Sequence, residues 1–365
     1  MADRAAESSS QKIMPAPVSV LGLASAVPAH VLDQKDVAER ARAIFAPTFA
    51  RFPKLADVFV NSGIDRRYSV HPMSWFERDV DWSGRNKAYM AGAADLFVAA
   101  ADNALARASR KASDIDMVVT VSSTGIATPS LEARVARRLG LRPDVVRVPV
   151  FGLGCAGGVS GLALASRLAR AEPGKTVLLV VVELCTLAFR RDRGSKADVI
   201  ACALFGDGAA AAVLTAGPSA PGLATIGAAA EHLWPGTLDI MGWTVDPIGF
   251  GVVLSRALPR FVEERFAAPA RQFASAPEFG NGASRFVCHP GGAKVLAGIE
   301  SALGLDSGTL IDERATLRDY GNMSAPTVLF VLERALARGL KGAAMLSALG
   351  PGFTASFLSL ETGHG

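Results

Sequence analysis

Cysteine, histidine and tyrosine are scarce in this sequence. It has four cysteines, five histidines and three tyrosines among 365 residues. The cysteines, at positions 155, 185, 202 and 288, are widely spaced and form no Cys-x-x-Cys pair. Their spacing argues against a zinc site or a disulfide framework and predicts a reducing, cytoplasmic location. No two histidines have the spacing of a catalytic metal site, so we expect no metal.

Long hydrophobic runs and basic tracts are missing as well. The longest aliphatic run, Val177 to Val182, ends at Glu183 and is too short to span a bilayer, so we expect no stable membrane insertion. The apolar segment from Val18 to Ala29 follows a polar leader and two prolines, which favours a buried first strand over a secretion signal. No basic tract is interleaved with aromatic residues as a nucleic-acid groove requires, so we expect no nucleic-acid partner.

Charges of the two signs are close to balanced, with a formal net charge of +4. Short basic clusters occur at Arg66-Arg67, at Arg137-Arg138 and from Arg190 to Arg193. Most of them fit solvated helix ends and loops. The alternative is that they steer a phosphate-bearing small molecule such as a coenzyme A ester.

The residues that are abundant indicate an α/β protein. Hydrophobic residues make up 50% of the chain and glycine occupies 36 positions, which suits layered strands and helices with tight turns. At this length the chain forms two domains or one large pseudo-symmetric body. We expect a mobile tail over residues 1–14, a first half over 15–218 and a second half over 219–365, divided where proline and glycine cluster between Gly217 and Gly222.

Hydrophobic periodicity predicts alternating strands and helices in both halves. The continuous apolar run 117–122 is expected to be a strand buried on both faces, and 146–151 and 176–183 are expected to be two further buried strands. Further strands are expected over 18–23, 222–230, 286–288, 343–348 and 354–360, and helices over 86–110, 131–139, 159–171, 259–273, 293–303 and 325–338.

A cysteine occupies a glycine-rich bend, Val150-Phe-Gly-Leu-Gly-Cys155-Ala-Gly-Gly158. It follows a predicted strand and opens a predicted helix, whose N-terminus offers free N–H groups and a positive partial charge that favour the thiolate. We expect the glycines of this bend to leave room for an incoming acyl group. A buried core cysteine is the ordinary alternative, but the strand–bend–helix context favours a nucleophile.

The same bend also has the letters of a dinucleotide-binding fingerprint, Gly152-x-Gly154-x-x-Gly157, and a later predicted strand ends in the acidic Glu183. A NAD-binding Rossmann protein is therefore an alternative. That alternative accounts for neither of the two polar motifs that come later in the chain.

Those two motifs are Cys288-His289-Pro-Gly-Gly292 and Gly321-Asn322-Met-Ser324-Ala-Pro326. His289 ends a predicted strand, where it suits an acid/base and an ion-pair partner of the Cys155 thiolate. Asn322 precedes a predicted helix, and either Asn322 or Ser324 can cap that helix. If Ser324 takes the cap, the Asn322 amide is free to donate to an oxyanion. Sulfur, imidazole and amide together indicate thioester chemistry.

With these motifs in this order, the chain resembles the type III polyketide synthases, the chalcone synthase-like branch of the thiolase-fold condensing enzymes, in its bacterial form. Two further segments carry the resemblance, Leu204-Phe205-Gly-Asp-Gly and Gly350-Pro-Gly352-Phe353. The resemblance implies a thiolase-like five-layered αβαβα fold built from two pseudo-symmetric halves, and a homodimer. It implies no cofactor beyond the coenzyme A thioesters that are the substrates.

The resemblance also implies residue roles. Cys155 takes a starter acyl group from an acyl-CoA, while His289 and Asn322 hold the thioester oxygen of malonyl-CoA as CO2 leaves. Iterative Claisen condensations and a cyclisation then follow. Phe205 matches a phenylalanine that gates the passage between the coenzyme tunnel and the cavity. Further residues that the resemblance places at the cavity are Cys185, Ala188, Ser324 and Gly352.

Two departures from the family pattern leave the substrate open. The second gating phenylalanine has no clear counterpart, and the nearest candidates are Phe250 and Val252. The basic residues that would hold the coenzyme phosphates cannot be aligned, and the candidates are Arg51, Lys54 and Arg66.

Small residues at the expected cavity positions Thr128, Cys185 and Ala188 predict room for a long aliphatic starter. The product would then be an alkylpyrone, an alkylresorcinol or a related aromatic polyketide. Within the same fold, a ketoacyl-carrier-protein synthase of the initiating type, which performs a single condensation, is the alternative. A non-catalytic scaffold of the fold would not need all three polar residues.

Overall fold

The computed structural model describes residues 16–217, 222–279, 283 and 285–363. The predicted tail over 1–14 and the predicted boundary between 218 and 219 lie outside the described residues. Within the described ranges, no helix combines the length and the apolar composition needed to cross a bilayer.

A nine-stranded sheet runs through both halves of the chain, in the order β11-β12-β13-β8-β1-β7-β6-β4-β5. Its first-half strands are β1 (Val18–Ala26), β4 (Met117–Val121), β5 (Val146–Val150), β6 (Thr176–Leu184) and β7 (Asp207–Ala216). Its second-half strands are β8 (Ala224–Leu233), β11 (Arg285–Cys288), β12 (Gly342–Gly350) and β13 (Thr354–Thr362).

The two halves repeat one arrangement of strands. In the first, β4 runs parallel to β6 and β6 antiparallel to β7; in the second, β11 runs parallel to β12 and β12 antiparallel to β13. The halves are joined where β1 pairs with β8 over only three residues, Val18 to Val20. The pseudo-symmetry is therefore present in the strand pairing itself.

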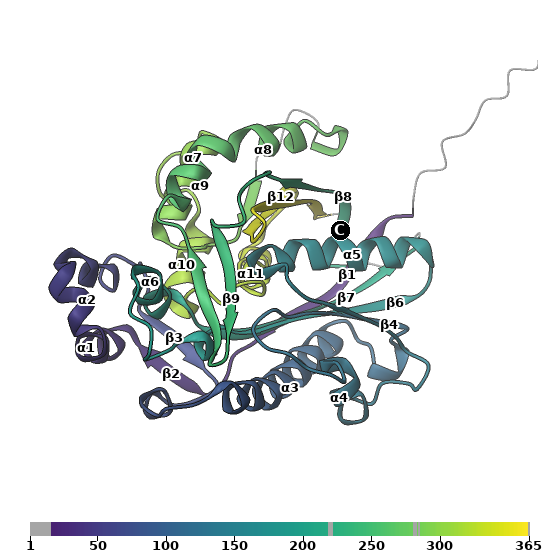
Figure 1. Ribbon diagram of the computed structural model, residues 1–365. Coiled ribbons are helices and arrows are strands. Elements are labelled where there is room, and N and C mark those ends of the chain that lie inside the picture. The colour runs from purple at the N-terminus through teal and green to yellow at the C-terminus, as the bar shows by residue number, and fades with distance from the viewer. Residues whose placement is uncertain (1–15, 218–221, 280–282, 284, 364–365) are drawn as a thin grey trace, which may run out of the picture.

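Helices form three layers around these strands. Between the halves lie α5 (Gly157–Ala171) and α11 (Thr327–Ala337), whose apolar side chains share one core cluster with strands of both halves. The first half is covered on its other face by α3 (Trp82–Arg107) and α4 (Leu131–Leu139), which Figure 1 shows on the side of β4 and β6 opposite to α5. The second half is covered by α7 (Leu258–Arg265), α8 (Ala267–Ala274) and α9 (Ala293–Leu303). The layer order is thus αβαβα.

Smaller elements surround the layers. Two strand pairs stand apart from the main sheet, β2 (His30–Asp33) with β3 (Arg66–Ser69) and β9 (Met241–Asp246) with β10 (Gly249–Leu254). The remaining α-helices are α1 (Gln34–Ile44), α2 (Ala46–Arg51), α6 (Lys196–Leu204) and α10 (Ile311–Tyr320). Short 3-10 turns are η1 (Pro53–Val58), η2 (Met73–Glu77), η3 (Ala112–Asp114), η4 (Gly154–Ala156), η5 (Cys185–Ala188) and η6 (Pro277–Phe279).

Two of the three strands predicted to be fully buried, β4 and β6, are buried at every residue. The prediction was wrong for β5, which is the edge strand of the sheet and leaves Val146 52% exposed. The single helix predicted over 259–273 is divided between α7 and α8 at Phe266. Pro269 explains the division, because it has no N–H to donate to the carbonyl of Arg265 and its ring clashes with that carbonyl in a continuous helix.

Candidate active site

Cys155 lies in the 3-10 turn η4, between the edge strand β5 and the central helix α5. Gly152 and Gly154 precede it with φ of +93° and +48°, a left-handed backbone that favours glycine. Both of their N–H groups donate to the hydroxyl of Ser123, at 3.1 and 3.4 Å. The sharp bend places Cys155 at the start of α5 and leaves its side chain 7% exposed.

The last two glycines of the motif have a different purpose from the one we expected. A Cβ on Gly158 would lie 2.6 Å from Cγ1 of Val328 and even closer to the carbonyl oxygen of Ala325, and a Cβ on Gly157 would lie 3.2 Å from Cβ of Ala325. These glycines let α5 approach the segment that opens α11. Their close packing brings Cys155 next to residues of the second half.

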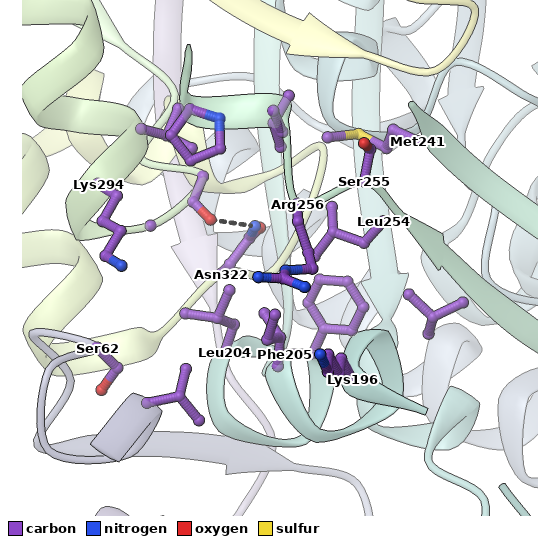
Figure 2. Close-up of a pocket in the computed structure, with 18 of the residues that line it drawn as sticks. Ser62, Lys196, Leu204, Phe205, Met241, Leu254, Ser255, Arg256, Lys294 and Asn322 are labelled. Carbon is purple, nitrogen blue, oxygen red and sulfur yellow. Dashed lines mark hydrogen bonds between the residues drawn. The ribbon is translucent and has the colours of Figure 1, made fainter. Parts of the chain in front are cut away.

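Asn322 is held by its backbone and by its side chain. Its N–H donates to the carbonyl of Leu204 at 2.8 Å, and its carbonyl accepts from Gly206 at 3.0 Å, so Asn322 and Phe205 form an isolated parallel bridge. Its side-chain Oδ1 accepts from the N–H of Ser324 at 2.8 Å. The amide nitrogen therefore faces the other way and donates to the carbonyl of Gly291 at 3.2 Å, as Figure 2 shows.

Neither Asn322 nor Ser324 caps α11, whose N-cap is Pro326 without a side-chain hydrogen bond. Ser324, at φ +61°, instead accepts a hydrogen bond from the thiol of Cys155, with Sγ and Oγ 3.4 Å apart. Of the two residues that we considered as caps, Ser324 thus contacts the sulfur of Cys155, and Asn322 lines the same cavity. Each is 8% exposed or less.

His289 follows β11 and is 3% exposed. Its N–H donates to the carbonyl of Ser347 at 2.8 Å, which continues the pairing of β11 with β12 by one residue. Among the described residues, neither ring nitrogen has a hydrogen-bond partner. Because a buried imidazole is normally satisfied, its two open nitrogens indicate a partner that enters the site.

Burial dominates the electrostatics of both groups. It raises the pKa of the Cys155 thiol to about 11, partly offset by the hydrogen bond with Ser324, and it lowers the pKa of His289 to about 3. We expected the start of α5 to favour the thiolate. The loss of water on burial opposes that effect, and both pKa shifts favour the neutral form of the two groups.

One cavity of about 1050 Å³ is lined by Cys155, His289 and Asn322 together. Among the other predicted site residues, Phe205, Cys185 and Ser324 also line this cavity. Gly352 does not, and the loop that contains it reaches the cavity through Leu349 and Pro351.

A second space of about 70 Å³, which we call the side pocket, has Ala188 in its lining. Cys185, Phe205 and Val252 line both spaces, so the side pocket adjoins the cavity at these three residues. Of the two candidates for a second gate, Val252 lies at this junction. Phe250 lies outside both linings and stacks on Trp243 at 5.7 Å.

Five basic residues line the cavity against a single acidic one, Asp57. Figure 2 shows that three of them, Lys196, Arg256 and Lys294, come from separate segments around the same space. Burial and the nearby charges of Arg256 and Arg51 lower the pKa of Lys196. The basic lining residues are Arg51, Lys54, Lys196, Arg256 and Lys294. Arg66, the third sequence candidate, is exposed on β3 and does not line the cavity.

Sequence reasoning missed Lys196, Arg256 and Lys294, although two of them carried a signal. Lys196 and Lys294 lie in the first turns of α6 and α9, where the helix dipole disfavours a positive charge. A lysine at a helix start needs another reason, and here both lysines border one cavity.

A buried carboxyl group is connected to the cysteine bend through hydrogen bonds. Glu183, at the end of β6, accepts from the N–H of Ser123 at 2.9 Å and from the hydroxyl of Thr124 at 2.7 Å. Burial raises the pKa of Glu183 to about 7. Because Ser123 accepts from Gly152 and Gly154, Glu183 fixes the loop on which the bend of Cys155 rests.

The fold and its cavity define a thiolase-like α/β condensing enzyme. The model of the N-terminal domain of chalcone and stilbene synthases matches residues 5–218, and the model of their C-terminal domain matches residues 225–361. The chain therefore belongs to the chalcone and stilbene synthase family. It is a type III polyketide synthase, an acyltransferase that performs decarboxylative Claisen condensations.

Relatives and solved structures agree with this assignment. The 1,3,6,8-tetrahydroxynaphthalene synthase of Streptomyces peucetius subsp. caesius is 38% identical over 94% of this chain and 93% of its own length. The crystal structure of 1,3,6,8-tetrahydroxynaphthalene synthase from Streptomyces coelicolor A3(2) matches with a TM-score of 0.88 at 27% identity, over 95% of this chain and 100% of that one. CsyB complexed with CoA-SH matches with a TM-score of 0.86 at 26% identity, over 95% and 100%. Membership in this family replaces the dinucleotide-binding interpretation of the glycine-rich bend.

Proposed function

We propose that Cys155 carries the acyl chain and that His289 and Asn322 hold the enolate, with coenzyme A thioesters as substrates. The observation that carries this proposal is the single cavity lined by all three side chains and bordered by five basic residues. In the halves over 15–218 and 219–365, the nucleophile belongs to the first and the other two residues to the second.

Loading starts with a proton transfer between Cys155 and His289. Burial disfavours either charge alone, but moving the proton from Sγ to the imidazole creates two opposite charges whose attraction is strong at low dielectric. The thiolate then attacks the thioester carbonyl of an acyl-CoA. The carbon–sulfur bond to coenzyme A breaks, and the leaving thiolate takes the proton from the imidazolium.

Extension uses the same residues in the neutral form. When malonyl-CoA loses CO2, the electron pair of the broken carbon–carbon bond forms an enolate. The second N–H of the Asn322 amide and an N–H of the neutral His289 ring are available to donate to its oxygen. The enolate carbon attacks the acyl thioester on Cys155, a carbon–carbon bond forms, and the sulfur leaves as thiolate.

The basic residues at the cavity suit the phosphates of coenzyme A. Arg51, Lys54, Lys196, Arg256 and Lys294 supply positive charge, and the starts of α6 and α9 add N–H groups and a positive partial charge. The solved structure of CsyB contains CoA-SH, and its similarity to this chain supports the same ligand here.

A long aliphatic starter is the substrate that the two spaces together support, because the catalytic cavity of about 1050 Å³ has room for the chain and the side pocket of about 70 Å³ can take a short end of it. The pocket adjoins the catalytic cavity, and its lining is mostly apolar, with Ala188, Ala201, Val37, Ile44 and Met73 among its residues. Burial of a hydrocarbon chain stabilises the acyl-enzyme by about 0.8 kcal/mol per methylene group. We therefore propose an alkylpyrone, an alkylresorcinol or a related aromatic polyketide as the product.

A product without an alkyl chain is the second candidate, because relatives of this chain are named 1,3,6,8-tetrahydroxynaphthalene synthase. A panel of acyl-CoA starters from acetyl to palmitoyl, each with malonyl-CoA, separates the two by product mass. Products that retain a long alkyl chain support the first proposal. Extension of malonyl-CoA alone, with long starters ignored, rejects it.

Residue roles are tested by two separate readouts. Cys155→Ala should abolish the acyl adduct seen by mass spectrometry but retain decarboxylation of malonyl-CoA. His289→Gln and Asn322→Ala should lower decarboxylation by roughly 100- to 1000-fold each. His232→Gln and Asn86→Ala are matched controls, because both residues lie outside the cavity. Full decarboxylation in either cavity variant would remove the role given to that residue.

We also propose that the enzyme is a homodimer joined along β5. This edge strand and its flanks expose Val146, Phe151 and Ile126 at 52%, 59% and 50%, and an apolar sheet edge of this kind needs a cover. Light scattering should give twice the mass of the chain for the wild type and a smaller species for Val146→Glu. A monomeric wild type would reject the proposal.

A further inference from the structure

The hairpin β9–β10 forms one wall of the catalytic cavity but lies outside the main sheet. Met241, Trp243 and Val252 are among its residues that line the cavity, and Val252 also lines the side pocket. An isolated two-stranded hairpin is marginal in water. The position of this wall therefore depends on what fastens the hairpin to the rest of the molecule.

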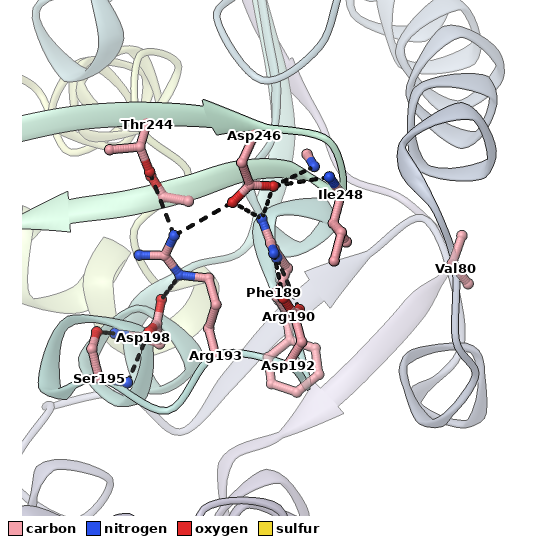
Figure 3. A network of polar contacts seen from close by, with 12 residues as sticks. Val80, Phe189, Arg190, Asp192, Arg193, Ser195, Asp198, Thr244, Asp246 and Ile248 are labelled. Atoms are coloured by element: carbon pink, nitrogen blue, oxygen red, sulfur yellow. Dashed lines mark hydrogen bonds and ion pairs between the residues drawn. The ribbon is translucent and has the colours of Figure 1, made fainter.

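The far end of the hairpin is fastened by an ionic network, shown in Figure 3. Asp246, at the turn, accepts two hydrogen bonds from Nη1 of Arg190, both at 2.7 Å. Arg193 lies 3.9 Å from the same carboxylate and reaches Thr244 of β9 at 3.5 Å. We call the group Arg190, Arg193 and Asp246 the hairpin clamp.

The clamp connects three elements that line the catalytic cavity or the side pocket. Arg193 also pairs with Asp198 at 3.1 Å, and Asp198 is part of the capping box that starts α6, the helix that ends next to Phe205. Arg190 directly follows the segment that holds Ala188 and Phe189 in the side pocket. Hairpin, α6 and this segment meet at the clamp.

Several observations show that the clamp is built tightly. The Arg190 side chain is only 4% exposed. Its segment is fixed from behind by Arg85 of α3, which donates to the carbonyls of Leu187 and Phe189 at 2.9 and 2.6 Å. A Cβ at Gly251 would collide with the guanidinium of Arg193, so the arginine crosses β10 where no side chain stands. Nη1 of Arg190 donates to both oxygens of Asp246, while Nε and Nη2 pair with the two oxygens of Asp192, so the guanidinium is held from two sides.

We propose that the hairpin clamp is a positioning network that holds Val252 at the junction of cavity and side pocket and so selects the length of the acyl chain. Cys185 and Phe205 are the other two residues of the junction. Cys185 belongs to η5 and Phe205 directly follows α6, and both of these segments are joined to the hairpin by the clamp. When the hairpin shifts, Val252 moves relative to these two residues, with which it borders both spaces. None of the three clamp residues lines the catalytic cavity, and of the three only Arg190 lines the side pocket.

Asp246→Asn is the variant that tests the clamp. Asparagine retains the oxygen that accepts from the N–H groups of Ile248 and Gly249 at 2.9 and 3.2 Å, so the turn is preserved while the charge is lost. The measured quantity is the ratio of kcat/KM for lauroyl-CoA to kcat/KM for hexanoyl-CoA. We expect this ratio to change by roughly five- to tenfold, because small changes in an apolar pocket discriminate by such factors.

Asp192→Asn is the matched control. Asp192 also pairs with Arg190 but belongs to the same segment as Arg190 and does not touch the hairpin. Its removal changes the charge equally and should leave the ratio within twofold of wild type. Arg190→Gln combined with Asp246→Asn should shift the ratio no further than either change alone, because the two residues act as one unit.

Both kcat/KM values are measured on the same preparation of a variant. A lower fraction of folded enzyme therefore reduces both values equally and leaves their ratio unchanged. Hydrogen exchange of residues 241–254 gives a second readout, which should quicken in Asp246→Asn and not in Asp192→Asn. Equal ratios in wild type and both variants would overturn the proposal. The inference rests on the proposed use of the side pocket by acyl chains, but the outcomes differ: a wild type that rejects long starters refutes that use, whereas a ratio insensitive to Asp246→Asn refutes only the clamp.

Discussion

Replacement of Gly158 by alanine tests whether the contact of α5 with α11 brings the catalytic residues together. The added Cβ would lie 2.6 Å from Cγ1 of Val328 and closer still to the carbonyl of Ala325, roughly 1 Å inside ordinary contact. The nearest atom is a backbone carbonyl oxygen, which cannot move aside as a flexible side chain can. The start of α5 and the segment before α11 must therefore separate. Cys155 lies three residues before Gly158, and Asn322 lies three residues before Ala325.

The expected magnitude has two parts. Overpacking costs about 1–3 kcal/mol, and alanine returns up to about 1 kcal/mol through its higher helix propensity, so the free energy of unfolding falls by at most ~3 kcal/mol. A misplacement of the order of 1 Å between reacting groups costs about 100-fold in rate. A protein that is stable by about 5–15 kcal/mol stays folded after such a loss, so the fall in rate should be measurable on folded enzyme.

Gly161→Ala is the matched control in the same helix. Its Cβ would meet side-chain methyl groups of Val121 and Leu179, not the backbone of the second half. We expect it to affect thermal stability to a similar or smaller extent and to retain most of the condensation activity. The assays are thermal unfolding, decarboxylation of malonyl-CoA and product formation. If Gly158→Ala condenses as fast as Gly161→Ala, the contact between the helices does not set the geometry of the site.

Three further predictions follow from the charges. In His289→Gln, the Cys155 thiol keeps its burial-raised pKa without a proton acceptor, so alkylation by iodoacetamide should need a higher pH than in wild type; an unchanged pH midpoint would argue against the proton transfer. Because the pKa of Glu183 is about 7 in the folded protein and about 4.5 when unfolded, the folded state binds more protons between these values. The free energy of unfolding of the wild type should therefore fall by about 3 kcal/mol relative to that of Glu183→Gln as pH rises from 4.5 to 7, and no further above pH 7. If the difference in melting temperature between the two proteins stays constant across this window, burial does not raise the pKa of Glu183. Neutralising Lys196, Arg256 or Lys294 should raise KM for malonyl-CoA by about fivefold each and leave kcat unchanged, whereas Arg66→Ala, outside the cavity, should change neither; equal effects at all four positions would point to general charge steering.

Much of the fold could be read from local sequence patterns, because each pattern reports the surroundings of its own segment. Continuous apolar runs identified β4 and β6 as buried strands. The periodicity of 131–139 and 293–303 gave α4 and α9 at their observed bounds. The edge position of β5 was missed although the strand carried a signal, because Arg147 and Pro149 alternate with its valines and a proline inside a strand is typical of a sheet edge.

The sequence by itself determined the chemistry of the site: a cysteine at a strand–helix bend, a histidine at a strand end and an asparagine before a helix, each beside glycine. Only the tertiary structure decided where the supporting groups lie. Lys196, Arg256 and Lys294 border one cavity, and Asp246 meets Arg190, although these residues are far apart along the chain. The physical reason is that charge pairing and cavity shape arise between elements, from packing that no single segment of sequence encodes.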